Sequence, residues 1–286
     1  MIDYVKTSHN LFGNVSRRIK FYFLDTKEEL QRASLNYTLE EYLSVMLFTS
    51  TIMFVVENII LAFIFGLLFS PVVAVFLSFT LSIAISGLMF FLFYSYPSTI
   101  ARSKEKSIKK TLPFATSYLS TISSGKLSPI ILFRTLAKFE EYGELARESG
   151  NIARNVELFG MTLSAAIKKQ ARRTPSKEFS ELLWGINTVI SSGGNLTDFL
   201  KEKGEEFMSD YRRRIRKYAQ DLSLFVEIYL TLIITGSIFF IVLSSIIATL
   251  SSGLGTVVLQ TFVVFVLLPL LSVGFIALIK SISPTE

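Results

Sequence analysis

Two long segments of the chain contain no lysine or arginine, and this feature constrains the fold more than any other. The 286 residues include 29 basic side chains, yet none occurs between Arg32 and Arg102 or between Lys217 and Lys280. Both gaps consist mainly of apolar residues, in four runs at 43–69, 72–94, 222–250 and 256–279. A helix of about 20 apolar residues is long enough to cross the hydrocarbon core of a bilayer. The sequence therefore predicts four transmembrane helices, arranged as two hairpins, in an all-α chain.

The positions of the basic residues predict the orientation of these helices. Basic side chains are enriched on the cytoplasmic side of membranes, and here they occupy the N-terminal segment up to Arg32, the segment 102–217 and position 280. Because an even number of spans places these three regions on one side, both termini and the middle region are expected in the cytoplasm. The short turns near Pro71 and Gly253 are then expected outside.

The expected organisation has five segments in a multi-pass protein of the cytoplasmic membrane. They are a cytoplasmic N-terminal segment at 1–41, a first hairpin at 42–96, a cytoplasmic helical bundle at 97–222, a second hairpin at 223–280 and a cytoplasmic tail at 281–286. The N-terminal segment is polar and mixed in charge, which is not typical of a cleavable signal peptide. A mean hydropathy of +0.49 excludes a purely soluble domain.

The composition also excludes several classes of site. Without cysteine, the chain has no disulfide, thiolate metal ligand or cysteine nucleophile, and its single histidine, His9, excludes a site that needs two imidazoles. Glu57 and Glu227 are the only acids within the predicted spans, and their different depths exclude the paired acids of an intramembrane protease. Ser124-Gly125-Lys126 lacks the flanking residues of a phosphate-binding loop. The sequence therefore predicts a non-enzyme that binds no metal, cofactor or nucleic acid.

The middle region, residues 97–222, is predicted to be a bundle of six helices. It carries 22 basic and 14 acidic side chains, a local charge of +8, and its apolar residues recur at helical spacing. The expected helices are 98–124, 129–140, 141–159, 165–173, 175–192 and one that runs from 198 into the third span. An internal repeat, whose period is close to that of tetratricopeptide units, leaves open a solenoid of that type. The copies share only their turn, which favours a compact bundle of three helical hairpins.

A turn motif that occurs three times sets several of these boundaries. The copies are Gly125-Lys126-Leu127-Ser128, Gly160-Met161-Thr162-Leu163-Ser164 and Gly193-Gly194-Asn195-Leu196-Thr197. In each copy the glycine is predicted to end a helix in the left-handed conformation, and the last hydroxyl residue to cap the next helix, with leucine before it as a staple. Pro129 and Pro175 are predicted to occupy the first position of their helices. We therefore interpret the three glycines as structural turn residues.

Four segments of the chain resemble a known family. They are Leu-Ser-Thr-Ile-Ser-Ser-Gly at 119–125, Tyr-Gly-Glu-Leu-Ala-Arg-Glu at 142–148, and the stretches 160–166 and 190–200. From residue 112 to 218, and into the third span, the chain resembles the F domain of type II secretion systems. That family includes GspF, PilC, TadB, TadC and the archaellum protein FlaJ. A single domain between two hairpins is more similar to TadB, TadC or an archaeal form than to members that carry two such domains.

This resemblance implies a membrane platform protein, without a catalytic site, in a pilus, archaellum or secretion machine. It further implies a hexameric assembly ATPase on the cytoplasmic side, pilin subunits, and a second copy or a paralogous platform protein as partners. The alternative is the membrane subunit of an ATPase-driven export permease or transporter. That alternative predicts several polar residues at the bilayer midplane, whereas only Glu57 and Asn58 interrupt the spans deeply.

Charged residues supply the candidate partner-binding sites. Ionised Glu57, near the middle of the first span, costs roughly 2.5–3.5 kcal/mol to insert, so we expect a partner such as Asn58, Thr51, another helix, a proton or an incoming pilin. The two basic clusters are Lys168, Lys169, Arg172 and Arg173, and Arg212, Arg213, Arg214, Arg216 and Lys217. The first cluster could dock a partner protein, although a solvated helix face is the simpler interpretation. The second could dock an acidic ATPase, although a topological anchor at anionic lipid is the simpler interpretation. An acidic group, Glu140, Glu141, Glu144 and Glu148, is also expected on a solvated surface.

Overall fold

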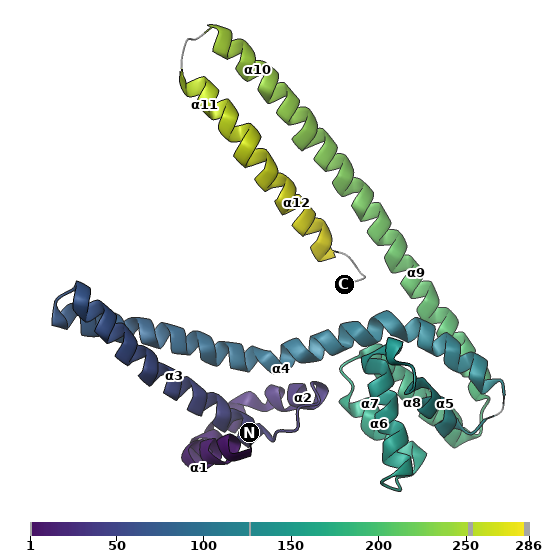
Figure 1. Cartoon of the computed structure of the whole chain (residues 1–286). Coiled ribbons are helices and arrows are strands. Elements are labelled where there is room, and N and C mark those ends of the chain that lie inside the picture. The colour runs from purple at the N-terminus through teal and green to yellow at the C-terminus, as the bar shows by residue number, and fades with distance from the viewer. Residues whose placement is uncertain (1, 126, 251–253, 283–286) are drawn as a thin grey trace. The chain divides into compact units, whose positions relative to one another are not determined.

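Every regular element that the computed structural model describes is a helix (Figure 1). The structure describes residues 2–125, 127–250 and 254–282. The chain divides into two compact units, Met1–Lys203 and Gly204–Glu286. The predicted all-α class is therefore confirmed.

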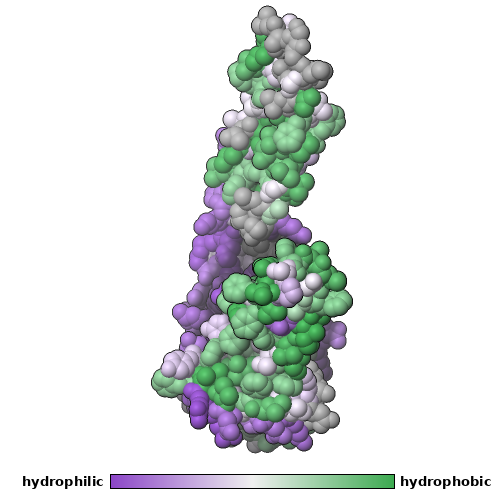
Figure 2. All heavy atoms as spheres, turned by 90° about the vertical axis from the view of Figure 1, so that its left-hand side faces the viewer, coloured by the Kyte–Doolittle hydropathy of each residue, from purple (hydrophilic) through white to green (hydrophobic). Residues whose placement is uncertain are grey.

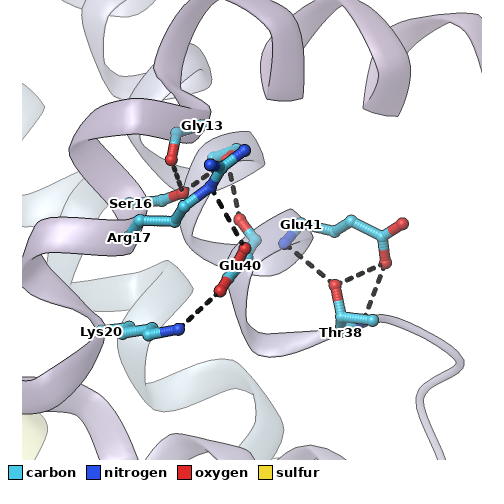
Figure 3. Close-up of polar contacts among 8 residues, drawn as sticks. Gly13, Ser16, Arg17, Lys20, Thr38, Glu40 and Glu41 are labelled. Atoms are coloured by element: carbon cyan, nitrogen blue, oxygen red, sulfur yellow. Dashed lines mark hydrogen bonds and ion pairs between the residues drawn. The ribbon is translucent and has the colours of Figure 1, made fainter.

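The N-terminal segment up to Arg32 is folded, which the sequence analysis did not predict. It forms α1 (Ile2–Ile19), a short 3-10 helix η1 (Lys20–Phe23) and α2 (Leu24–Arg32). α1 packs on the start of α3 (Leu39–Leu68) through small residues: the buried Ser44 Oγ donates to the buried Ser16 Oγ at 3.1 Å (Figure 3). Small side chains let two helices approach closely, so this contact holds α1 against the first predicted span.

The first hairpin consists of α3 and α4 (Pro71–Ser123), which pack extensively on each other. Thr38 begins α3 with a capping box: its hydroxyl accepts from the Glu41 backbone N–H at 3.2 Å, and its own N–H donates to Glu41 Oε2 at 2.8 Å (Figure 3). Pro71 occupies the first turn of α4, where its missing N–H costs nothing. The tight turn near Pro71 is therefore present.

The predicted helix start at residue 98 is wrong, because α4 continues without interruption from the first hairpin into the bundle. This helix has 53 residues and contains Pro97 and Pro113. A proline removes one backbone hydrogen bond and bends a helix, but the helix persists where packing supports both sides. Both prolines are buried, and Figure 1 shows α4 bending along its length.

The bundle combines the end of α4 with shorter helices that follow it. These are α5 (Pro129–Leu136), the 3-10 helix η2 (Glu140–Tyr142), α6 (Glu144–Glu157), α7 (Leu163–Arg173), α8 (Lys177–Ser192) and the start of α9 (Leu196–Ile228). Their core includes the fully buried Phe133, Leu145, Ile152, Ile167 and Leu183. α4 packs on α5, α6 and α8. A solenoid repeat contacts only its neighbours, so this arrangement favours the bundle.

Two of the three turn glycines have the expected backbone conformation. Gly160 and Gly193 have φ angles of 64° and 70°, in the left-handed region that glycine adopts most readily. The prediction is wrong for Gly125, which has no such angle: its N–H donates to the Ile122 carbonyl at 3.1 Å, as in a simple turn that follows α4. Lys126, the next residue of this motif, lies outside the described residues.

The capping residues of the second and third copies lie two positions earlier than predicted. The Thr162 hydroxyl accepts from the Ala165 N–H at 3.3 Å, and Asn195 Oδ1 accepts from the Thr197 N–H at 3.0 Å. The leucine of each motif is thus the first helical residue and not a staple. Ser164 is already the second residue of α7, and its hydroxyl donates to Asn187 Oδ1 of α8 at 2.6 Å.

The start of α8 is also displaced from its predicted position at Pro175. Ser176 caps this helix, because its buried hydroxyl accepts from the Phe179 N–H at 3.2 Å. Thr174 instead ends α7, where its N–H bonds to the Gln170 carbonyl at 2.9 Å. Pro129, in contrast, begins α5 as predicted, with Ser128 before it.

The second unit contains the second hairpin. Its helical segments are the end of α9, η3 (Tyr229–Thr235), α10 (Gly236–Leu250), α11 (Leu254–Phe262), η4 (Val263–Leu267) and α12 (Leu268–Ile282). η3 and η4 are π-helical. The Tyr229 hydroxyl lies 3.1 Å from Ser272 Oγ, and its ring packs on Phe275 with centroids 5.0 Å apart. The predicted break at 251–255 is shortened by α11, and positions 251–253 and the tail residues 283–286 lie outside the described residues.

Four helical segments among the described residues are long and apolar enough to cross a membrane. They lie within Leu39–Leu68, Pro71–Ser123, Leu196–Ile247 and Gln260–Ala277. Large apolar side chains remain exposed along both hairpins, among them Phe63, Phe76 and Phe265. Figure 2 shows these surfaces as predominantly hydrophobic. Such surfaces are stable in lipid rather than in water, so the prediction of four transmembrane helices in a multi-pass membrane protein is confirmed.

Candidate functional site

Glu57 lies on α3, and of the alternatives predicted for its partner, neither Asn58 nor Thr51 bonds to it in the described residues. Its Oε2 atom is shielded from solvent and has no hydrogen-bond partner among the described residues, and the same holds for Asn58 Nδ2. Thr51 cannot help, because its hydroxyl donates to the Leu47 carbonyl of its own helix at 2.8 Å. The hydroxyl of Ser82, on α4, is also enclosed without a partner. The first hairpin thus retains polar groups whose hydrogen-bonding capacity is unused.

The first basic cluster occupies one exposed side of α7. Two of its members have contacts within the bundle: Lys169 Nζ donates to Asn155 Oδ1 at 3.3 Å, and the Arg172 guanidinium lies 6.0 Å from the centre of the Trp184 ring. Lys168 and Arg173 are exposed. α7 itself contains no acidic residue to offset this positive charge.

Next to this cluster the structure exposes an apolar pair that the sequence analysis missed. Leu158 and Phe159, in the turn between α6 and α7, are 74% and 69% exposed. Asn155, which accepts from Lys169, is three residues before Leu158. In the sequence, this exposed pair could have been recognised because two large apolar residues, Leu158 and Phe159, stand immediately before the turn residue Gly160, where polar residues are usual. We call Leu158, Phe159, Lys168 and Arg173 the α6–α7 surface.

The acidic group does not form one solvated surface. Glu140 and Glu141 are exposed, whereas Glu144 pairs with Lys104 at 3.6 Å and with Arg147 at 2.7 Å. Glu148 is 4% exposed, so the prediction of a solvated side chain is wrong there. Its position on α6 faces the core, where α6 packs on α4 and α7.

Burial raises the pKa of Glu148 above the ordinary value for glutamate, because a low-dielectric interior disfavours the charged form. The nearby polar side chains of Thr174 and Gln170 and the positive charge of Lys104 partly oppose this shift in pKa. The described residues contain no group of three or more histidine, aspartate or glutamate side chains that could hold a metal ion. Because the pKa of Glu148 differs from that of an exposed glutamate, its ionisation is linked to the stability of the bundle.

The second basic cluster, residues 212–217, lies on α9 in the second unit. Arg213 pairs with Asp210 and donates to Ser209 Oγ at 3.2 Å. Arg212, Arg216 and Lys217 are exposed, and Arg214 is half-buried. The five residues precede the apolar part of the same helical segment, which is the position expected of residues that interact with lipid headgroups.

The helical bundle, joined to helices that can span a membrane, defines the class of protein to which the comparisons point. Residues 115–244 match the family model described as "Type II secretion system (T2SS), protein F". The matched region begins within α4, includes the whole of α5, α6, α7, α8 and α9, and ends within α10. The resemblance to the F-domain family is therefore confirmed over this part of the chain.

Curated relatives come from archaea. The chain is 27% identical over 191 residues to a Flagella accessory protein J of Methanocaldococcus jannaschii, an alignment that covers 66% of this chain and 33% of the relative. It is 28% identical over 145 residues to the Flagella accessory protein J of Methanococcus voltae, covering 50% and 26%. An uncharacterised protein of Methanocaldococcus jannaschii is 27% identical over 199 residues, covering 67% and 33%. The matched part of the chain thus spans about a third of the length of these relatives or less, and no solved structure matches it.

Proposed function

We propose that this protein is a membrane platform of an archaellum, pilus or secretion machine, which couples a cytoplasmic assembly ATPase to the insertion of pilin subunits at the filament base. The F-type domain, the relatives named Flagella accessory protein J and the four candidate spans support this proposal. A platform acts by binding other proteins, and this function requires no catalytic group of its own.

The observation that carries the proposal is the continuity of α4. The same 53-residue helix forms the second half of the first hairpin and packs on α5, α6 and α8 of the bundle. A continuous helix, even a bent one, transmits a displacement better than a flexible linker does. A movement that an ATPase imposes on the bundle is therefore passed directly to the membrane hairpin.

Within the hairpin, Glu57 is the candidate contact for a pilin. Its Oε2 atom and Asn58 Nδ2 lack partners among the described residues, and a polar group from a pilin segment would satisfy them. We expect Glu57→Gln to slow filament assembly by at least tenfold in living cells, measured by electron microscopy and by release of assembled pilin. Assembly at the normal rate and length would remove this role from Glu57.

At the bundle, the α6–α7 surface is the candidate contact for the ATPase. An exposed apolar pair beside exposed basic residues fits an acidic surface that contains an apolar pocket, since such a partner matches both features. Lys168 and Arg173 can be changed without disturbing the contacts of Lys169 and Arg172 within the bundle.

The test is co-purification of the assembly ATPase with the full-length protein in detergent. We expect Lys168→Glu combined with Arg173→Glu to reduce the ATPase recovered by at least tenfold. Lys138→Glu with Lys177→Glu is the matched control, because it makes the same charge change at exposed residues of α8 and of the turn after α5, and it should leave recovery unchanged. Equal recovery with both double variants would refute the proposed docking surface, and failure of the unmodified protein to bind any assembly ATPase would refute the proposed function.

A further inference from the structure

The N-terminal helix α1 has an apolar stripe that stays largely exposed among the described residues of its own unit. One side of α1, which includes Phe12 and Ser16, packs on α3. Tyr4, Leu11 and Val15 are seven and four residues apart, so they lie together on a neighbouring side. All three are exposed, Leu11 by 63%. Tyr4 lies at the edge of the packing side, because its ring also contacts Phe48 of α3 with centroids 5.2 Å apart, whereas Leu11 and Val15 extend the stripe away from that side.

The short helix η1 extends this apolar surface with two aromatic residues. Phe21 and Tyr22 are 77% and 84% exposed. Phe23, the next residue, turns the other way and packs on Phe90 and Tyr94 of α4, with ring centroids 6.3 and 5.8 Å apart. Phe23 thus fixes η1 at the end of the hairpin where α4 leaves its apolar run.

The contacts of α1 with α3 show how far along the apolar run of α3 this surface extends. Lys20 Nζ pairs with Glu40 at 2.8 Å, just before the apolar run of α3, which begins at Leu43 (Figure 3). At the other end, the Tyr4 hydroxyl lies 2.8 Å from Thr49 Oγ1. With a rise of 1.5 Å per residue, Thr49 lies about 9 Å inside the apolar run. Helices that lie in the membrane interface bury their apolar side by about 5–10 Å.

The lengths of the two contacting segments show that α1 crosses α3 obliquely. The residues from Tyr4 to Lys20 extend over about 24 Å, whereas those from Glu40 to Thr49 extend over only about 14 Å. A helix parallel to α3 would contact a segment as long as itself. An oblique helix at the end of a spanning hairpin has the orientation of an interfacial helix.

The charges on the same segment fit a bilayer surface. Lys6, Arg17 and Arg18 are exposed, and residues 1–32 carry six basic and four acidic side chains. Basic residues next to a membrane are attracted to anionic headgroups, while aromatic side chains accumulate at the level of the headgroups. Both residue types are found here at the boundary of the apolar hairpin.

We propose that α1 and η1 lie in the membrane interface, where Tyr4, Leu11, Val15, Phe21 and Tyr22 contact lipid and Arg18 faces lipid phosphate. The occupant of the exposed apolar stripe is the bilayer itself. This segment then holds the first hairpin at a fixed depth in the membrane, a role that does not depend on the proposed platform function.

The absence of cysteine makes this proposal directly testable, because any introduced cysteine is unique. The full-length variants Leu11→Cys, Phe21→Cys and Glu28→Cys would each carry a nitroxide spin label, in vesicles of phosphatidylcholine with or without phosphatidylglycerol. Collisions with oxygen report lipid exposure, and collisions with a water-soluble nickel chelate report water exposure. Leu158→Cys is the matched control, because Leu158 is as exposed as Leu11 and Phe21 but belongs to the bundle.

Labels at positions 11 and 21 should collide at least fivefold more with oxygen, relative to nickel, than labels at positions 28 and 158. Phosphatidylglycerol should increase this ratio, and Arg18→Glu should reduce the increase. Nickel accessibility at positions 11 and 21 equal to that at 158 would overturn the proposal. Low accessibility to both reagents would also overturn it, because a second copy of the protein would then cover the stripe.

Discussion

Glu148 shows how a charged residue can be placed in the core of a bundle whose outer faces are highly charged. Its side chain is 4% exposed, and its Oε2 atom has no hydrogen-bond partner among the described residues. The neighbouring Gln170 and Thr174 are buried as well. A buried carboxyl group in these surroundings favours its neutral, protonated form.

This environment predicts a specific pH dependence of bundle stability. Because burial raises the pKa of Glu148, the folded chain binds this proton more tightly than the unfolded chain. The free energy of unfolding therefore falls as pH rises from the ordinary glutamate pKa through the raised value. Glu148→Gln removes the titrating group, so its melting temperature should decline less steeply over this pH range. The single tryptophan, Trp184 of α8, reports bundle unfolding by fluorescence in detergent.

The exposed Glu141 provides the comparison for this experiment. Glu141→Gln makes the same chemical change without altering the core, so its melting temperature should follow the unmodified protein at every pH. If Glu148→Gln also followed the unmodified protein, the carboxyl group of Glu148 would have no part in the pH dependence.

Gly193 is a residue at which backbone conformation alone predicts the effect of a mutation. It ends α8 with φ 70° and ψ 21°, and a Cβ added there would meet no atom within 4 Å. A residue with a Cβ in this left-handed conformation costs about 1–2 kcal/mol. We expect Gly193→Ala to lower the free energy of unfolding of the bundle by about 1 kcal/mol, measured by Trp184 fluorescence in urea. Gly193→Asn should lower the free energy of unfolding by less, because asparagine tolerates the left-handed conformation. Equal decreases for the two variants would contradict a conformational cause.

At the scale of elements, local composition was sufficient to predict the spans but not the helix ends. A long apolar run predicts a membrane helix from its own length, whereas the position of a cap depends on where tertiary packing lets the helix begin. Thr162 and Ser164 are both suitable caps by residue type, but α7 begins at Leu163, and Ser164 is a helical residue whose hydroxyl donates to Asn187. Asn187 is 23 residues away in the sequence, so no local pattern contains this information.

The same reasoning explains why α1 and the core position of Glu148 were missed. The buried residues of α1 include Ser8, Gly13 and Ser16, so small and polar residues interrupt the apolar pattern by which the buried side of a helix is recognised. Glu148 is one of several acids on consecutive helical turns, and only the packing of α6 on α4 and α7 distinguishes it from the exposed members. The basic residues of α7, in contrast, are recognisable from the sequence because they are adjacent and exposed.

The contact between α8 and α9 allows a prediction about two elements. A Cβ at Gly185 would overlap the ring of Phe199, so α9 begins in direct contact with the backbone of α8. Gly185→Ala should lower the free energy of unfolding of the bundle by about 1–3 kcal/mol, because overpacking forces one helix away from the other. In a Phe199→Leu background the same substitution should cost less, since the shorter side chain leaves room for the methyl group. Urea unfolding of the four proteins gives the coupling energy, and a cost independent of residue 199 would show that the two helices are not in contact there.

At the scale of the whole molecule, equal exposure of apolar side chains has different meanings in different parts. Phe63 of the first hairpin is 71% exposed and Leu158 of the bundle is 74% exposed. The first belongs to a continuous apolar surface that requires lipid, and the second belongs to a small patch with basic neighbours, for which we propose a protein partner. The distribution of charge along the chain therefore has to be known before an exposed apolar residue can be interpreted.

The same distribution of charge predicts which parts of the molecule face the cytoplasm. The region 97–222 carries a charge of +8, and an even number of spans places it on the same side as both termini. Ser70, in the exposed turn between α3 and α4, is then on the outside. A maleimide that cannot cross membranes should label Ser70→Cys in intact cells, but label Glu28→Cys and Glu181→Cys only after the membrane is opened. Labelling of Glu181→Cys in intact cells would place the bundle outside, where an ATPase that uses cytoplasmic ATP cannot reach the α6–α7 surface.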